Sequence, residues 1–300
     1  MGNCLIIGGN GFIGRHLTKA LLKKGFEVEV LDVKKNMIKG VNFIEGSITD
    51  KKVIKNSVRG KQFVFHLAST TFPASSMEKP VYDAETNLLP AINIFRECTN
   101  AGVKKLFFPS SGGAIYGNIE TEKANEKTPV NPQSPHAIIK LAIENYLNYF
   151  WKVHGLDYAC LRIGNAYGPE QNTEKGLGFV SKCIEKAKNS EELIIYGDGL
   201  AIRDFVYIDD IVNAFILATE TKTKEKVFNI GSGEGKSIKK VISSVENLLG
   251  KEIKKKFLPL REGDIKKIVL DISLAKRKLG YEPKIMLEEG IRRMWYPPKT

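Results

Sequence analysis

The sequence NCLIIGGNGFIG at residues 3–14 decides the fold. Its apolar run at residues 5–7 is typical of a buried parallel strand, and three glycines follow at a spacing of three: Gly8, Gly11 and Gly14. Glycines in such a turn let the backbone approach a pyrophosphate and let the next helix pack closely on the sheet. That helix would direct its free N–H groups and positive dipole end toward the phosphates. The stretch therefore predicts a dinucleotide-binding turn.

A second strand, expected at residues 27–31, leads to Asp32, eighteen residues past Gly14. A carboxylate at this position accepts hydrogen bonds from the adenosine ribose hydroxyls. Asp32 favours NAD because it would repel the 2′-phosphate of NADP. Lys34 and Lys35 leave NADP as an alternative cofactor, although these two lysines equally fit a solvated turn.

Length and composition limit the class of protein. A chain of 300 residues, 42% of them hydrophobic, can form one large α/β domain and a smaller lobe. No apolar stretch approaches the roughly 18 to 20 residues of a membrane span, and the N-terminal apolar residues belong to the first strand rather than to a signal peptide. Four scattered cysteines without a CxxC pair indicate reduced thiols in a cytoplasmic protein.

The net charge of +12 raises the question of nucleic-acid binding. The lysines are spread along the chain without the interleaved aromatic residues of a stacking surface, and a basic balance also suits an anionic small molecule. We expect no nucleic acid, no membrane and no metal as partner.

Strand and helix signals alternate through the first half of the chain. Strands are expected at 63–68, 106–111 and 158–163, with amphipathic helices at 84–101 and 137–153. This alternation predicts an α/β fold of the Rossmann type, a doubly wound parallel sheet. Beyond Pro169 the elements become shorter, which indicates a smaller C-terminal lobe. We expect an NAD-binding domain over residues 1–168 and a substrate-binding lobe over 169–300, with about 204–231 returning to the first domain.

A series of motifs then gives a specific resemblance. They are GGNGFIG (8–14), FHLAS (65–69), PSSGGAIYG (109–117), SPHAIIK (134–140), RIGNAYGP (162–169), GDGLAIRDFVYIDD (197–210), NIGSGEG (229–235) and REGD (261–264). In their order and spacing, over nearly the whole length, the chain resembles extended short-chain dehydrogenases/reductases of the NAD-dependent epimerase/dehydratase family. Within that family it is most similar to the UDP-hexose 4-epimerases.

The resemblance implies roles for individual residues. NAD would be held by Gly8, Gly11, Phe12, Ile13, Gly14, Asp32, Leu67, Ala68 and Lys140. Asn165 would contact the UDP-sugar, and Arg203 and Arg261 would clamp its pyrophosphate, which suits guanidinium geometry. Ile268 stands where family members restricted to unsubstituted hexoses carry a larger tyrosine, so N-acetylated sugars are expected to fit.

More ordinary interpretations stay open for some of these residues. Arg203 has two neighbouring carboxylates, Asp204 and Asp209, with which an exposed ion pair would be common. Asn165 lies between two glycines and also fits a plain turn.

The family reaction is a two-way hydride transfer. A tyrosinate removes the proton of the sugar 4-hydroxyl, hydride leaves C4 for NAD, and the 4-keto sugar turns and is reduced on its other face. A lysine four residues after the tyrosine stabilises the anion. In this chain that lysine is Lys140, but His136 occupies the tyrosine position, and the usual serine or threonine position falls on Gly112, with Ser111 or Ser110 as substitutes.

His136 leaves three interpretations open. Neutral imidazole can act as a base near neutral pH, but its conjugate acid would be a cation beside Lys140. In the first, the chain is an impaired epimerase. In the second, His136 or a neighbour such as Tyr116 takes the role of the tyrosine. In the third, the site has another function.

Rival functions also remain. A sugar-nucleotide dehydratase or reductase is less favoured, because dehydratases of the family carry an acidic pair where this chain has Gly113 and Ala114. A non-catalytic NAD-sensing module is a further alternative. We expect a homodimer formed through the helices at 84–101 and 137–153.

Overall fold

The computed structural model describes residues 2–34, 38–173, 178–261 and 263–296, and their contacts divide the chain into two compact units. Unit 1 comprises Met1–Ser111, Ser134–Arg162 and Val212–Phe228, and unit 2 comprises Gly112–Gln133, Ile163–Ile211 and Asn229–Thr300. Residues 112–133, expected from the sequence to belong to the NAD-binding domain, lie in unit 2. They group with unit 2 because the Ala124 amide donates to the Val269 carbonyl at 2.8 Å and the Tyr116 hydroxyl donates to Asn229 Oδ1 at 2.7 Å.

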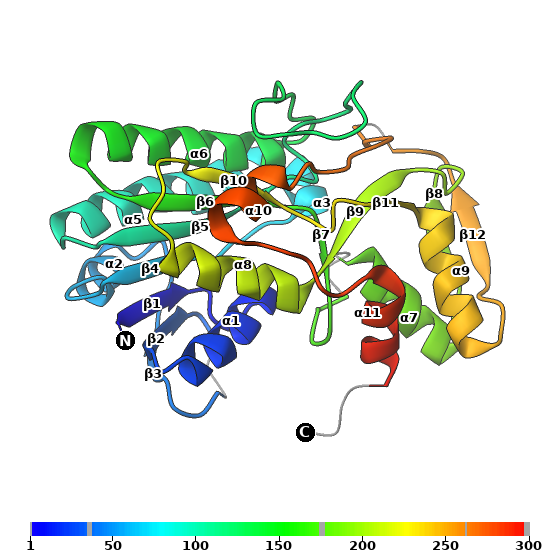
Figure 1. Cartoon of the computed structure of the whole chain (residues 1–300), viewed down its shortest axis with the longest axis horizontal. Coiled ribbons are helices and arrows are strands. Elements are labelled where there is room, and N and C mark those ends of the chain that lie inside the picture. Colours follow the sequence, from blue (N-terminus) through cyan, green and yellow to red (C-terminus); the bar gives the residue numbers. More distant parts are fainter. Residues whose placement is uncertain (1, 35–37, 174–177, 262, 297–300) are drawn as a thin grey trace. The chain divides into compact units, whose positions relative to one another are not determined.

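A seven-stranded sheet forms the centre of the nucleotide-binding fold (Figure 1). Its strand order is β10-β6-β5-β4-β1-β2-β3, with β1 pairing in parallel with β2 and β4, β2 with β3, and β4 with β5. The strands span Asn3–Ile7 (β1), Glu27–Asp32 (β2), Asn42–Glu45 (β3), Phe63–His66 (β4), Lys105–Ser111 (β5), Tyr158–Ile163 (β6) and Val227–Ile230 (β10). The predicted Rossmann-type parallel sheet is confirmed.

Helices cover both faces of this sheet because successive strand side chains point to opposite sides. Leu5 and Ile7 belong to one core with side chains of α2 (Lys51–Ser57), α5 (Leu89–Asn100) and α6 (Pro135–His154). On the other face, Phe65 contacts Phe215 of α8 (Ile208–Glu220) at 6.1 Å between ring centroids. The remaining helix of this layer, α1, spans Phe12–Lys23.

The helix expected at 84–101 is more complex than its periodicity indicated. Two short helices, α3 (Pro73–Glu78) and α4 (Pro80–Asp83), precede a π-helical turn, η1 (Ala84–Leu88), which continues directly into α5. Single π turns widen a helix by one residue and often occur at functional sites. Here the turn directly follows Asp83.

Unit 2 contains two small sheets and four helices of its own among the described residues. One sheet has the order β11-β9-β7 and the other pairs β12 with β8. The strands span Asn165–Tyr167 (β7), Leu193–Tyr196 (β8), Ile202–Tyr207 (β9), Gly235–Ser237 (β11) and Lys255–Leu258 (β12), and the helices Phe179–Asn189 (α7), Ile238–Leu249 (α9), Ser273–Leu279 (α10) and Leu287–Trp295 (α11). Within the described part of the chain, no helix is long and apolar enough to span a membrane, and no three His, Cys, Asp or Glu side chains gather as a metal site requires.

Candidate active site

The glycine turn between β1 and α1 is built as a close-approach cradle. Gly8 has a φ of +87°, and a Cβ on it would lie 2.6 Å from the Ala68 amide nitrogen. A Cβ on Gly14 would lie 2.3 Å from the Gly8 carbonyl oxygen, so α1 can pack on the turn only because this residue is glycine. Both distances are too short for any side chain.

The start of α1 leaves its amides available to a ligand. Gly11 is the N-cap residue and cannot supply a capping side chain, and the first turn, which includes Phe12 and Ile13, holds no acidic residue within the described chain. Helix N-terminal amides without a capping group favour an anion. The cradle and the uncapped helix therefore fit the pyrophosphate of a dinucleotide.

Asp32 ends β2 beside this cradle. Its carboxylate accepts hydrogen bonds from the amides of Asn10 at 2.9 Å and Lys34 at 3.2 Å, which ties it to the glycine turn. Leu67 follows β4, and its amide donates to the Ile7 carbonyl at 2.8 Å. The residues expected around the adenosine half of NAD thus gather at the carboxyl ends of β1, β2 and β4 in unit 1. Lys35 lies outside the described residues.

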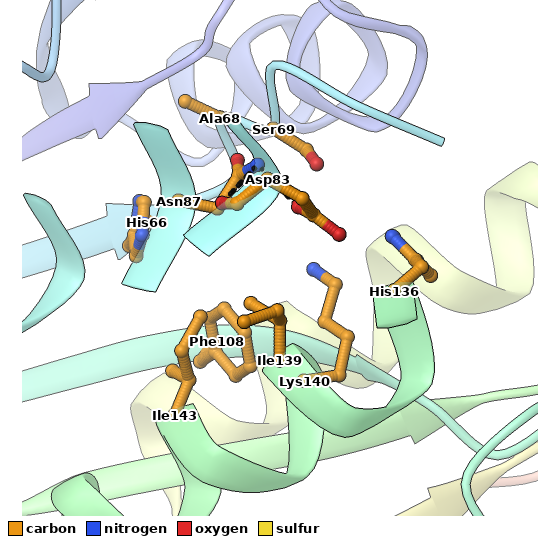
Figure 2. A pocket seen from close by; sticks show the side chains of 10 residues that line it. All are labelled: His66, Ala68, Ser69, Asp83, Asn87, Phe108, His136, Ile139, Lys140 and Ile143. Atoms are coloured by element: carbon orange, nitrogen blue, oxygen red, sulfur yellow. Dashed lines mark hydrogen bonds between the residues drawn. The ribbon is translucent and has the colours of Figure 1, made fainter. Parts of the chain in front are cut away.

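A second group of side chains surrounds a small cavity in unit 1 (Figure 2). His136 and Lys140 stand one helical turn apart on the same face of α6, and both line this cavity. The lining residues are His66, Ala68, Ser69, Asp83, Asn87, Phe108, His136, Ile139, Lys140 and Ile143. The cavity is large enough for about one water molecule.

Local contacts fix the start of α6 and the lysine. The Ser134 hydroxyl caps the helix by accepting from the Ala137 amide at 3.3 Å, and the His136 amide donates to Ser76 Oγ of α3 at 3.2 Å. Lys140 Nζ donates to the Pro109 carbonyl at 2.9 Å and lies 4.5 Å from the centroid of the Phe108 ring. The ammonium is therefore held on the β5 side of the cavity.

The electrostatics of this pair oppose proton uptake by imidazole. Burial, and secondly the Lys140 charge, lower the pKa of His136 to about 3. Burial also lowers the pKa of Lys140 to about 8, against smaller opposite effects of Cys160, Asp83 and Glu144. The effect of the Lys140 charge on the imidazole is the one expected from the sequence, and burial is the larger cause.

The two serines and the tyrosine considered as partners of His136 have different surroundings. Ser111 ends β5, half-buried, and is not among the described residues that line the cavity. The Ser110 hydroxyl is buried without a hydrogen-bond partner within the described chain. Tyr116 is 1% exposed, and its hydroxyl donates to Asn229 Oδ1 at 2.7 Å inside unit 2. The prediction that Tyr116 could replace His136 as the base is therefore wrong, because its hydroxyl is buried and hydrogen-bonded to Asn229.

Unit 2 brings three of the four expected substrate residues together. Arg203, on β9, donates to the carbonyl of its neighbour Ile202 at 2.9 Å, and the Ile268 amide donates to that same carbonyl at 3.1 Å. Arg261 pairs with Asp264, Nη2 to Oδ1 at 3.0 Å, and its guanidinium lies 4.2 Å from the Tyr196 ring centroid. Burial lowers the pKa of Arg203, while Asp264 raises it and Arg261 lowers it.

The carboxylates considered as ion-pair partners of Arg203 are engaged by other groups. Asp204 accepts the Ser232 amide at 2.7 Å and the Leu270 amide at 3.1 Å, and Asp209 pairs with Arg293 at 3.7 Å. Two guanidinium groups near one another with a single carboxylate suit a bound dianion. Asn165 begins β7, and its Oδ1 is buried without a partner among the described residues.

Sequence reasoning missed Asp83 and Asn87, which also line the cavity. Asn87 Nδ2 donates to Asp83 Oδ1 at 2.8 Å, and the Thr70 amide donates to Asn87 Oδ1 at 2.9 Å. The available signal was two polar residues four apart, Asp83 and Asn87, at the start of a helical segment that also buries the polar residue Asn93. Such residues in a buried face are expected to pair or to meet a ligand.

The fold and these groups define a class of protein: a nucleotide-binding enzyme fold of the short-chain dehydrogenase/reductase type. The model of the NAD dependent epimerase/dehydratase family matches residues 4–231. The chain belongs to this family, and NAD is its cofactor.

Proteins of known structure or curated name support the same assignment. The chain is similar to the UDP-glucose 4-epimerase of Thermotoga maritima, solved with UDP-glucose, with a TM-score of 0.94 and 37% identity over 98% of this chain and 97% of that chain. It is similar to the UDP-glucose 4-epimerase of Thermus thermophilus, solved with NAD, with a TM-score of 0.92 and 35% identity over 99% and 100% of the two chains. The UDP-glucose 4-epimerase of Mycolicibacterium smegmatis is 32% identical over 300 residues, covering 96% of each protein.

Proposed function

We propose that this protein is an NAD-dependent epimerase that inverts C4 of a UDP-hexose or a UDP-N-acetylhexosamine through a 4-keto intermediate. The observation that carries the proposal is the similarity to UDP-glucose 4-epimerases along almost the whole of both chains. The two residue groups described above support it, one suited to a dinucleotide and the other to a diphosphate.

In this proposal the cofactor lies at the carboxyl ends of the central strands. Gly8, Gly11 and Gly14 admit the pyrophosphate to the backbone, and Asp32 accepts the adenosine ribose hydroxyls. Further contacts with NAD come from Phe12, Ile13, Leu67 and Ala68. Lys140 binds the nicotinamide ribose. NAD, when bound, supplies the acceptor and donor of hydride at C4.

The UDP-sugar is assigned to residues of unit 2. Arg203 and Arg261 clamp the pyrophosphate. The side chain of Asn165 forms a hydrogen bond with the UDP-sugar. Ile268 offers a smaller side chain than tyrosine beside C2. The proposal therefore includes N-acetylated sugars as substrates.

His136 is proposed to limit the rate of this reaction. A group with a pKa of about 3 is neutral at pH 7 and has little driving force to accept the proton of a sugar hydroxyl. Lys140 and a serine of the Ser110–Ser111 pair complete the proposed acid–base group. His136 also favours one second candidate, an NAD-sensing module without turnover, whereas Arg203 and Arg261 favour a protein that binds a sugar nucleotide. The dehydratase or reductase alternative stays less supported, because residues 113 and 114 are not acidic.

Proton NMR tests the proposed reaction directly. The protein as purified is incubated with UDP-galactose and, separately, with UDP-N-acetylgalactosamine, and the anomeric signals of the C4 epimers are followed. We expect slow formation of both gluco epimers without a dehydrated or reduced product. A 4-keto-6-deoxy product would establish a dehydratase, and tight NAD with no product from either sugar would favour the sensing module.

The diphosphate clamp has its own test. UDP should raise the melting temperature of the protein, since a ligand that binds only the native state stabilises it by mass action. Arg203→Ala should abolish most of that increase, while Arg292→Ala, which removes an exposed arginine paired with Glu289 at 2.8 Å, should preserve it. Equal increases in all three proteins would place the UDP elsewhere.

We further propose a homodimer formed by α5 and α6. The exposed side chains of these helices include a series of apolar residues: Leu89, Ile138, Tyr146, Tyr149 and Val153. All four cysteines are buried and unpaired, which supports residence in a reducing compartment such as the cytoplasm.

A further inference from the structure

Asp83 is a buried carboxylate with one oxygen held firmly in place. The residue is 1% exposed and lies at the end of α4, directly before the π turn. Its Oδ1 accepts hydrogen bonds from Thr71 Oγ1 at 2.6 Å and Asn87 Nδ2 at 2.8 Å. These two bonds orient the carboxylate and connect the segment after β4 to the helix that leads into α5.

The other oxygen of Asp83 has no hydrogen-bond partner within the described chain. Figure 2 shows the carboxylate directed toward the space between the Lys140 amino group and His136. A buried carboxylate oxygen without a partner is costly unless a positive charge or a water compensates it. The cavity has room for about one water between these groups.

Lys140 is the cation whose charge Asp83 can stabilise. The other titratable groups acting on or affected by Lys140 are Glu144, Cys160, His66 and His136. Glu144 already pairs with Arg162, Nη2 to Oε2 at 2.7 Å, and burial keeps the Cys160 thiol neutral by raising its pKa. Both histidines are neutral at pH 7 because burial lowers the pKa of each to about 3. Asp83 therefore remains as the carboxylate that faces Lys140. Within the described chain, no arginine or lysine forms an ion pair with Asp83 within 4.0 Å.

We propose that Asp83 is a positioning residue that keeps the Lys140 ammonium charged and directed at residue 136, through the water-sized cavity they share. The inference rests on the proposed function only in treating Lys140 as part of the site. A phenolate at position 136 would neutralise the ammonium, whereas a neutral imidazole cannot, so Asp83 is the negative charge proposed to face Lys140 in this chain.

The direct test is the titration of Lys140 in Asp83→Asn. The full chain is labelled with lysine carrying ¹³C at Cε, and the Lys140 resonance is assigned by its absence in Lys140→Arg. We expect the Lys140 pKa to fall by about one pH unit or more in Asp83→Asn, the usual effect of losing an opposite charge nearby. In the control Glu97→Gln, which removes a buried carboxylate paired with Arg96 at 3.2 Å, the Lys140 titration should not change.

Two further measurements separate charge from packing. Thr71→Val removes a hydrogen bond to Asp83 but keeps its charge, so it should shift Lys140 much less than Asp83→Asn; equal shifts would overturn the proposal. If Asp83→Asn does not fold, the reverse experiment uses Lys140→Met. Removal of the lysine charge should then make the Asp83 carboxyl titrate at higher pH in ¹³C spectra. An unchanged Lys140 titration in folded Asp83→Asn, or an unchanged Asp83 titration in Lys140→Met, would refute the role. These readouts need no turnover, so they stand or fall independently of the epimerase proposal.

Discussion

At the scale of single residues, the histidine at position 136 matters most for the chemistry. It occupies the start of α6, where Ser134 and Ser76 fix the backbone, and its side chain lines the same cavity as Lys140, one turn further on. A lysine beside a phenol lowers the phenol pKa, because it favours the anion. The same lysine beside an imidazole disfavours the cation. One residue type therefore reverses the sign of an otherwise unchanged interaction.

The first prediction concerns that reversal. His136→Tyr should raise the rate of 4-epimerisation by two or more orders of magnitude, the usual scale of a well-placed acid–base group. Steady-state rates with UDP-galactose measure it, and Phe in place of His136 serves as the control that fills the space without an ionisable group. A fast reaction in the unmodified protein that slows in His136→Tyr would establish His136 as the working base.

A second prediction at this scale concerns pH and His66. This residue is 1% exposed, and burial, with a smaller contribution from Lys140, lowers its pKa to about 3. Between pH 6.5 and 3 the unfolded chain binds a proton that the folded chain does not, so the free energy of unfolding falls as the pH decreases through this window. At pH 5 the loss is about 2 kcal/mol for one such group.

Urea titrations at pH 7 and pH 5 test this dependence. His66→Gln should reduce the loss between the two pH values by up to that amount, because glutamine does not titrate in this window. His154→Gln replaces an exposed histidine and should leave the loss unchanged. Identical pH dependence in all three proteins would contradict the buried neutral imidazole.

At the scale of secondary-structure elements, the sequence predicts those with a strong local signal. The apolar runs of β1, β5 and β6 and the periodic helices α1 and α6 were expected and are confirmed. The edge strand β3, with the sequence NFIE, was not expected because a four-residue strand with polar ends has no clear alternation. The π turn at Ala84–Leu88 also escaped prediction, since it differs from an α-helix by one residue and is fixed by the contacts of Asp83 and Asn87.

The site was predictable to the same degree. Gly8, Gly14, Asp32, His136 and Lys140 stand in motifs with fixed spacing, so their positions followed from the sequence. Asp83 belongs to no such motif, because its role depends on a cavity lined by four separate segments of the chain. Which polar atoms lack a partner can be known only from the folded structure.

Asp32 provides the prediction that belongs to β2 and the glycine turn. Asp32→Ala removes the proposed acceptor for the ribose hydroxyls and also the acceptor of the Asn10 amide in the turn. We expect NAD affinity to fall about tenfold or more, as for loss of hydrogen bonds to a charged group. Calorimetry on NAD-free protein measures it. Glu45→Ala removes an exposed carboxylate paired in register with Asp32 on β3 and should bind NAD normally; equal losses would show a general charge effect.

At the scale of the whole molecule, the open question is what covers the exposed face of α6. Ile138, Tyr149 and Val153 are 52%, 48% and 60% exposed, and their spacing of eleven and four residues places them on one face of the helix. A patch of this kind on the surface of a monomer indicates an interaction site. In a two-fold symmetric dimer the same patch meets itself, so each side chain counts twice.

Tyr149→Glu tests that arrangement, because a two-fold interface would place the new carboxylates of both copies in the same apolar contact. We expect the unmodified chain to sediment as a dimer of 33.5 kDa subunits and the variant to dissociate at micromolar concentration. Phe257→Glu alters an equally exposed aromatic residue on β12 of unit 2 and should stay dimeric. Analytical ultracentrifugation distinguishes the outcomes: an unmodified chain that sediments as a monomer, or a Tyr149→Glu variant as dimeric as the control, would mean that α6 does not form the subunit contact and that its apolar face serves another partner.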